Sequence, residues 1–349
     1  MPDFQEVLRA SEDDRRDLFV VTARRLGTTA VNAEKDFWVC WTLDALFNRL
    51  PAGPRVLFKG GTSLSKAFGL ISRFSEDIDV TVFRDDLGVP VTIDELEGRS
   101  GKQRRATLEK IRDVCRKFIA GPLRTHLGAW LTQQLAEVGL PASGGRIELD
   151  PDDTDTQTLL IWYPSVTLED DRYVRRAIKI EAGAKSALDP NSIQRITPYA
   201  ATDVADLDLV VPNVVTIDAE RTLWDKIVIL HGLRSWYDVR GELRQEGERT
   251  SRHYYDVHQL LASETGRAAA QDAALGAECV RHARMFFNRP DFHLERARPG
   301  RFALSPSPGM LDALRRDYDR MSAMIFGPIP SLGDVIASIA TLEERVNAP

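Results

Sequence analysis

The stretch KGGTSLSKAFGLISRFSEDIDV, residues 59–80, holds the residues whose spacing best suits chemistry. Asp77 and Asp79 stand two positions apart, so in an extended strand they face the same side, roughly 7 Å apart along the chain. Two carboxylates aimed at one point repel each other unless a cation lies between them, and oxygen ligands of this kind suit Mg²⁺ or Mn²⁺. The pair therefore predicts a divalent metal site.

The glycine pair upstream of these acids is typical of a turn that binds phosphate. Gly60 and Gly61 allow the backbone to turn tightly and to approach a ligand, and amides at the start of a following helix attract anions. Thr62 and Ser63 add hydroxyl donors. A single DxD on a strand is usually a solvated face and a single glycine pair is usually a turn, but their order and closeness favour a site for a nucleoside triphosphate with its metal.

The elements that must position these residues are two short strands and a helix. Residues 55–58 are predicted as a buried strand, residues 63–70 as a two-turn helix, and residues 77–82 as a second strand with alternating apolar and polar residues. The remaining pattern predicts helices at 3–26, 32–50, 101–120 and 123–138, strands at 145–149, 158–163 and 174–182, and helices after residue 218, with a charged break at 240–252.

The predicted fold class is α+β, a small mixed sheet flanked by helices and followed by an all-helical C-terminal part. The expected domains are N-terminal helices over residues 1–54, an α/β core over 55–215 and a helical domain over 216–349. The pattern assigns no role to the helices beyond residue 265.

Composition excludes several other classes of protein. The 349 residues are 43% hydrophobic and carry a formal net charge of −6, so no bulk basic excess indicates nucleic-acid binding. The three cysteines have neither disulfide nor zinc spacing, and the six histidines show no zinc motif. No run of 18 apolar residues and no targeting signal is present in the sequence, so we expect a cytoplasmic protein without a membrane contact.

Three motifs together resemble the AbiEii/AbiGii-type toxins, a branch of the DNA polymerase β-like nucleotidyltransferase superfamily found in bacterial toxin–antitoxin and phage-defence systems. They are residues 59–80, AEKDFW at 33–38, and ERTLWDK at 220–226. The resemblance implies a polymerase β-like fold and a two-metal nucleotidyl transfer in which Asp77 and Asp79 hold the metals and a third acid completes the site.

Glu181 is the candidate for the third acid. In residues 176–181, strand alternation places Lys179 and Glu181 on one face, and the resemblance implies an acid in a similar strand. The alternative is an ordinary surface glutamate on an edge strand.

Lys226 falls inside the apolar stripe of a predicted helix. Since an unpaired buried ammonium is costly, Lys226 must either reach water or meet an anion. The triphosphate oxygens or the site carboxylates are the expected partners, and a lysine whose stem packs while its head reaches water is the alternative.

The stretch RHYYDV, residues 252–257, is similar to the last motif of the family, in which two acids are usual. His253 replaces the first acid here, which leaves Asp256 as the matching residue. Asp256 is expected either to hold Lys226 or to act as a base toward the acceptor hydroxyl, and an aspartate on a helix surface is the alternative.

The function that the resemblance implies is that of a toxin. The protein would bind NTP·Mg²⁺ and transfer a nucleoside monophosphate to an acceptor hydroxyl, by family analogy the 3′ end of a tRNA, which would block translation; a cognate antitoxin is the expected partner. One alternative is kinase-like transfer of the γ-phosphoryl group to a protein or small molecule on the same scaffold, and another is a nucleotide-binding module without catalysis.

Two further features leave alternatives open. The basic residues of the predicted helix at 101–120 form either a face for RNA phosphates or a solvated face. Ser75 is either a site where a phosphate would crowd the carboxylates or a hydroxyl that satisfies the turn into the strand.

Overall fold

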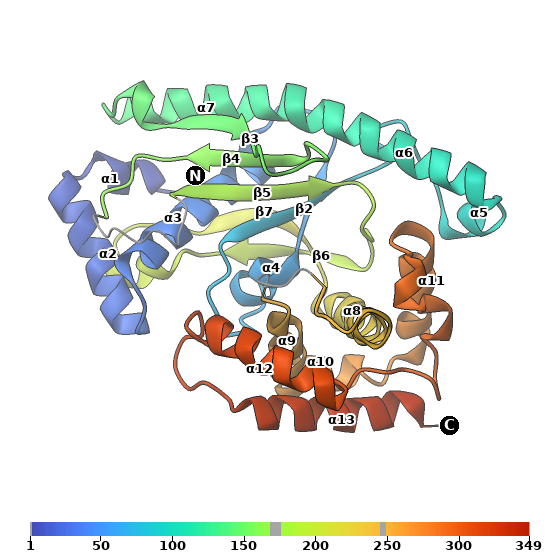
Figure 1. Ribbon diagram of the computed structural model, residues 1–349. Helices are drawn as coiled ribbons and strands as arrows, with labels where there is room; N and C mark the ends of the chain where they lie inside the picture. The colour runs from blue at the N-terminus through green and yellow to red at the C-terminus, as the bar shows by residue number, and fades with distance from the viewer. Residues whose placement is uncertain (1, 168–175, 245–248, 349) are drawn as a thin grey trace. The chain divides into compact units, whose positions relative to one another are not determined.

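The structure is a computed structural model that describes residues 2–167, 176–244 and 249–348. The chain divides into two compact units (Figure 1). The first comprises Met1–Ala67, Phe74–Val91 and Arg105–Ile217. The second comprises Phe68–Arg73, Thr92–Arg104 and Asp218–Pro349, so a six-residue segment that interrupts the first unit belongs to the second.

A mixed sheet forms the centre of the first unit. Its seven strands have the order β3-β4-β5-β2-β1-β7-β6. Their bounds are β1 Val56–Lys59, β2 Asp77–Val82, β3 Arg146–Leu149, β4 Thr158–Trp162, β5 Ala177–Gly183, β6 Asn191–Ile196 and β7 Val211–Ile217. The helical segments of this unit are α1 Phe4–Arg9, α2 Glu12–Leu26, α3 Ala30–Asp44, η1 Ala45–Arg49, α4 Gly60–Lys66, η2 Ile119–Leu123, α7 Arg124–Glu137, η3 Ala142–Gly144 and η4 Tyr199–Asp203, and most of α6 Gly101–Phe118 belongs to it.

The central strands β1, β2 and β5 are buried because apolar residues dominate them. β2 runs antiparallel to β1 and parallel to β5, and Ile78 and Val80 of β2 are fully buried. The alternating residues Asp77 and Asp79 stay partly accessible. The period-2 pattern therefore places both acids on one face of the middle strand, as the sequence predicts.

Helix α3 is the main helix of the core of this unit. Its aromatic residues pack edge-on or stacked: the Phe4 and Phe37 rings lie 5.3 Å apart, and the Trp38 and Tyr163 rings stack at 5.1 Å. Such pairs add to the burial of large apolar surfaces. α3 thus packs against the strands β5 and β7 of the sheet.

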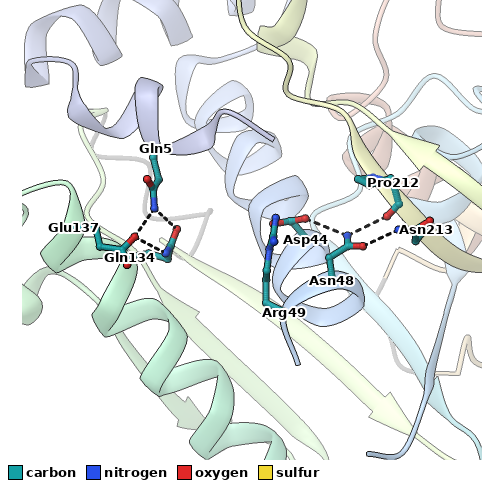
Figure 2. A network of polar contacts seen from close by, with 8 residues as sticks. All are labelled: Gln5, Asp44, Asn48, Arg49, Gln134, Glu137, Pro212 and Asn213. Atoms are coloured by element: carbon teal, nitrogen blue, oxygen red, sulfur yellow. Dashed lines mark hydrogen bonds and ion pairs between the residues drawn. The ribbon is translucent and has the colours of Figure 1, made fainter. Parts of the chain in front are cut away.

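The π-helical turn η1 at the end of α3 is held by a polar network (Figure 2). The Asp44 carboxylate accepts from Arg49 Nε at 2.8 Å and from Asn48 Nδ2 at 3.1 Å. Asn48 also donates to the Pro212 carbonyl at 3.0 Å and accepts from Asn213 Nδ2. The network ties η1 to the first residues of β7.

A second set of contacts in Figure 2 joins α1 to α7. The Gln5 side chain donates to Gln134 Oε1 at 3.0 Å and to Glu137 Oε2 at 2.5 Å, and Gln134 donates to Glu137 at 3.0 Å. α7 also packs beside β3, so it lies against the edge of the sheet.

The second unit is helical. Its elements are α5 Ile93–Glu97, α8 Ala219–Arg240, α9 Ser251–Ala262, α10 Glu264–Ala269, α11 Ala273–Phe286, η5 Pro290–Phe292, η6 Leu294–Arg296, α12 Pro308–Ser322 and α13 Leu332–Asn347. α8 packs against α9, α10 and α11. The segment Phe68–Arg73 enters this unit through a bridge between Arg73 and Ile325 and a hydrogen bond from Phe326 N to Ser72 O.

The mixed sheet with helices confirms the predicted fold class, although several elements differ in detail. The short helix after the glycine pair begins at Gly60 and not at residue 63, because Lys59 is extended and Gly60 adopts a positive φ of 85°. β6 and β7 were not predicted. β7 carries Pro212 and an Asn213 with φ of 60°, which obscure a strand pattern.

Parts of two predicted features lie outside the described residues, namely residues 174 and 175 of the predicted strand at 174–182 and residues 245–248 of the charged break. Among the helices that the structure describes, none is both long and apolar enough to span a bilayer. The division into three domains stays a prediction.

Candidate active site

The glycine turn lies in direct contact with the second aspartate. A Cβ atom built on Gly60 would stand 2.1 Å from Asp79 Oδ2, far inside van der Waals contact. Only a residue without a side chain, and one that tolerates a positive φ, fits here. The turn and the carboxylate therefore form one compact arrangement.

We expect Gly60→Ala to abolish activity beyond what backbone strain explains. The added methyl group forces the Asp79 carboxylate out of place, whereas Gly69→Ala is the matched control: Gly69 has φ of 62° but open space around it. Each substitution costs about 1 kcal/mol for the left-handed backbone. Nucleotidyl transfer should fall only in Gly60→Ala, and equal activity of the two variants at equal unfolding free energy would contradict a role for the contact.

Three carboxylates are brought together on neighbouring strands of the first unit. Asp79 of β2 is the register partner of Glu181 on the parallel strand β5, and Asp77 is the partner of Lys179. Lys59 Nζ lies 3.6 Å from Asp79 Oδ1, and Lys179 Nζ lies 2.5 Å from Glu181 Oε1. Asp79 and Glu181, which are paired across β2 and β5, are therefore each in contact with a lysine.

The Asp77 carboxyl is surrounded by negative charge. Burial and the nearby carboxylates of Glu76, Glu181 and Asp79 raise its pKa from 3.8 to about 7, and Lys35 opposes this. Clustered carboxylate oxygens of this kind match the ligands that Mg²⁺ and Mn²⁺ prefer. The residues present therefore fit a divalent cation, although within the described ranges no three His, Cys, Asp or Glu side chains are already grouped around a metal position.

This pKa predicts a pH-dependent metal affinity. Below pH 7 a proton occupies Asp77 and competes with the metal, so affinity for Mn²⁺ should rise as pH increases from 6 to 7, by at most about tenfold, and level off above. The stability of the metal-free fold changes with pH in the opposite direction. An acid with a raised native pKa loses its stabilising proton as pH rises from 3.8 through about 7, so stability falls over that window.

Thermal melting with and without Mn²⁺ between pH 5.5 and 8.5 measures both effects. Asp77→Asn should melt without this pH dependence and gain little from Mn²⁺. A wild-type Mn²⁺ affinity that stays constant across the range would contradict the assignment.

The Thr62 and Ser63 hydroxyls are engaged within the turn itself. Thr62 donates to the Asp77 carbonyl at 2.5 Å and lies 2.8 Å from the Ser75 hydroxyl, while Ser63 donates to the Gly60 carbonyl at 2.9 Å. Both residues are buried. Thr62 thus holds the first residue of β2 beside the turn, Ser63 braces the turn itself, and the Ser75 hydroxyl is bonded to Thr62.

Three consecutive charged residues of α3, Glu34, Lys35 and Asp36, are buried, and each is at most 4% exposed. Glu34 accepts hydrogen bonds from the Val166 amide and from Thr167. Lys35 pairs with Glu76 at 2.6 Å, and Asp36 pairs with Lys66 at 2.7 Å.

The Lys66 ammonium nitrogen also lies 3.6 Å from the centre of the Tyr199 ring. The backbone amide of Tyr199 donates a hydrogen bond to the Asp36 carboxylate at 2.6 Å. Since a buried charge is tolerated only when it is paired, these contacts fix the end of α4 through Lys66 and the approach to β2 through Glu76. The sequence showed the EKD motif but not these partners.

A separate cluster of charges lies in the second unit. Asp256 of α9 is fully buried and accepts two bonds from Arg73, Nε to Oδ1 at 2.7 Å and Nη2 to Oδ2 at 2.9 Å. Lys226 of α8 lies 2.8 Å from the same carboxylate. Burial alone would raise the pKa of Asp256, but the two cations outweigh it and hold that pKa far below its usual range.

The structure places Asp256 against Lys226, which is the contact that one of its two expected roles requires, and a carboxylate with so low a pKa is a poor base. The role itself stays a prediction. His253, which replaces the usual acid, has a pKa well below its ordinary value because of burial and the nearby Lys226 and Arg252. It therefore adds no negative charge, and two cations share one carboxylate.

Arg73 is the residue of this cluster that the sequence interpretation missed. It lies within the motif region, six residues before Asp79, and only its bidentate contact with a residue 183 positions away shows its part. Asp77, Asp79 and Glu181 belong to the first unit, whereas Lys226 and Asp256 belong to the second.

A mixed sheet whose neighbouring strands present three carboxylates beside a glycine turn is the arrangement that the resemblance to nucleotidyltransferases predicts. The family profile described as nucleotidyl transferase AbiEii toxin of the type IV toxin–antitoxin system matches residues 41–344. The chain belongs to this AbiEii family of nucleotidyltransferase toxins.

Among solved structures, MenT4, a nucleotidyltransferase toxin from Mycobacterium tuberculosis H37Rv, is similar in fold. The match has a TM-score of 0.50 and 12% sequence identity, and it covers 96% of this chain and 90% of that one. No curated protein sequence matches the chain.

Proposed function

We propose that the protein binds a nucleoside triphosphate with Mg²⁺ or Mn²⁺ and transfers its nucleoside monophosphate to the 3′ hydroxyl of an RNA, in the first place a tRNA. The observation that supports this most is the row of acids on β2 and β5 in contact with the Gly60 turn. A metal-bearing triphosphate would neutralise the charge that raises the pKa of Asp77.

The proposed roles in the first unit follow from these contacts. Asp77, Asp79 and Glu181 hold the metals, and the backbone of Gly60 and Gly61 approaches the phosphates. Glu181 must exchange its contact with Lys179 for the metal, which frees a cation beside the substrate. When bound, the metal supplies Lewis-acid stabilisation of the charge on the reacting phosphate.

The sequence predicts that the Thr62 and Ser63 hydroxyls donate to phosphate, but in the structure both hydroxyls are bonded within the protein. Their side chains shape the turn, so any contact with phosphate comes from their backbone amides or follows a rotation of the hydroxyl. Glu76 and Lys35 keep Asp77 in place.

Lys226 is proposed as a phosphate-binding cation on the strength of its own surroundings. Lys226 is a nearly buried cation beside Asp256, the same carboxylate that Arg73 contacts, so positive charge is held at this position. Such a charge stabilises the transferring phosphoryl group. Asp256 orients the ammonium group and is not itself the base.

The reaction conserves atoms as follows. The acceptor hydroxyl oxygen forms a bond to the α-phosphorus, the bond between that phosphorus and the bridging oxygen of the β-phosphate breaks, and pyrophosphate leaves with the electron pair while the hydroxyl proton passes to solvent. Adding a nucleotide to a tRNA 3′ end would prevent aminoacylation and so arrest translation. The type IV assignment of the family supports a cognate antitoxin as partner.

Labelled substrate separates this proposal from its rivals. Incubation with RNA and either α-labelled or γ-labelled NTP should transfer only the α label to RNA. Transfer of the γ label to protein or to a small molecule would establish the kinase-like alternative, and transfer of neither label, with nucleotide still bound, would leave a binding module. Sequencing of RNA 3′ ends from cells that express the protein identifies the acceptor.

A further inference from the structure

Helix α6, Gly101–Phe118, has a charge opposite to that of the chain as a whole. Its sequence GKQRRATLEKIRDVCRKF contains seven Lys or Arg and two acids, a net charge of +5, in a chain with a formal net charge of −6. The remainder of the protein is therefore at −11, because −6 minus 5 is −11. Positive charge is concentrated on this one helix.

The basic side chains gather on the solvent-facing side of α6. Ile111 and Cys115 are fully buried and mark its inner side. Five bases of α6 are exposed, namely Lys102, Arg105, Lys110, Arg116 and Lys117. Within the residues that the structure describes, Arg105, Lys110 and Lys117 form no ion pair, and Arg116 has only a long contact of 3.6 Å with Asp113.

A second observation extends this surface toward the acids. Lys185 follows Glu181 by four residues, just beyond the end of β5, and is partly buried. Its pKa is lowered by burial, and Arg112 of α6 is close enough to lower it further, while Asp155 opposes this. Arg112 has two long ion-pair contacts, 3.6 Å to Asp155 and 3.8 Å to Asp113, so it is weakly held by the protein's own acids.

The surface also has a suitable length. The 13 residues from Arg105 to Lys117 span about 18 Å of helix at 1.5 Å per residue. The phosphates of a nucleic acid present negative charge at regular spacing over such a distance, and basic side chains bind them without reading sequence.

We infer that the exposed basic face of α6, with Lys185 near Arg112, binds the phosphate backbone of the acceptor RNA. The inference rests on the proposed function, since it supplies the surface that the body of an RNA acceptor needs once its 3′ end is at the carboxylates. An acidic chain thereby gains RNA affinity through one local face.

Binding of fluorescein-labelled tRNA, followed by anisotropy from 50 to 300 mM KCl without nucleotide, tests this surface. The variant Lys110→Gln/Arg116→Gln/Lys117→Gln removes three exposed charges. The matched control Arg298→Gln/Arg301→Gln/Arg316→Gln removes three exposed charges from the C-terminal part of the chain. Melting curves confirm that both variants fold.

The α6 variant should bind at least about tenfold more weakly at 100 mM KCl, and the slope of log K against log salt should decrease by about 1 for each residue removed. The control should bind like the wild type. Equal losses in the two variants, an unchanged α6 variant, or a wild type without affinity for tRNA would each overturn the inference.

Stabilisation by NTP and Mn²⁺ should be the same in the α6 variant as in the wild type. If no label reaches RNA from any NTP while tRNA binding still depends on α6, the proposed transfer fails and the surface stands. If transfer to RNA occurs but is equally efficient in the α6 variant, the surface fails and the transfer stands.

Discussion

Asp79→Asn is expected to reduce nucleotidyl transfer by about 10³-fold or more and to remove toxicity on expression. The substitution keeps the size of the side chain, so the Gly60 contact is preserved, but it removes the charge that we assign to metal binding. Loss of several kcal/mol of stabilisation of the reacting phosphate corresponds to this factor. Single-turnover transfer of the α label to RNA measures it.

Asp13→Asn is the matched control, because Asp13 is 86% exposed and lies in α2. It should leave activity unchanged. Mn²⁺ titration by calorimetry or electron paramagnetic resonance gives an independent readout, in which Asp79→Asn weakens metal binding. An Asp79→Asn protein that transfers nucleotide at the wild-type rate would refute the assignment of the site.

Asp256→Asn should lower the free energy of unfolding by about 3–5 kcal/mol. The carboxylate is fully buried between Arg73 and Lys226, and the amide cannot neutralise either cation. The large cost arises because the carboxylate that both cations contact is lost at a buried position. Urea unfolding of the two proteins, compared at equal slope, measures the difference.

The pH dependence of that difference has a definite sign. The native pKa of Asp256 lies far below its ordinary value of 3.8, so the ion pairs stabilise the fold fully above about pH 5 and lose their contribution as pH falls below 3.8. The loss of unfolding free energy caused by Asp256→Asn should therefore be smallest at acidic pH. Asp238→Asn serves as control, since its pair with Arg234 is largely solvated and contributes about 0–1 kcal/mol.

A small and pH-independent effect of Asp256→Asn would show that Arg73 and Lys226 reach water without their partner. In that case the cluster would be a surface feature, and the reason for assigning Lys226 to phosphate would be lost.

The strand with Asp77 and Asp79 was predictable because side-chain alternation is a local property. The alternation of buried Ile78 and Val80 with accessible acids lies within six consecutive residues, and the glycine pair indicates the turn before the strand. The mixed sheet with a helical C-terminal part followed from the same local periods.

Pairings between distant residues were not predictable from local pattern. The contact of Arg73 with Asp256 spans 183 positions, and Lys35 pairs with Glu76, an acid directly before Asp77. α3 shows little amphipathic pattern, since its charged residues are as buried as its apolar ones. β6 also escaped prediction because only two of its six residues, Ile193 and Ile196, are apolar.

The buried triplet Glu34, Lys35 and Asp36 has a consequence for how the chain is made. Among the described residues, Glu34 accepts bonds from residues 165–167, Lys35 pairs with Glu76, and Asp36 is held by Lys66 and by the Tyr199 amide 163 positions further along the chain. This set of contacts is therefore complete only once Tyr199 has been synthesised, so α3 acquires its last polar partner late in translation.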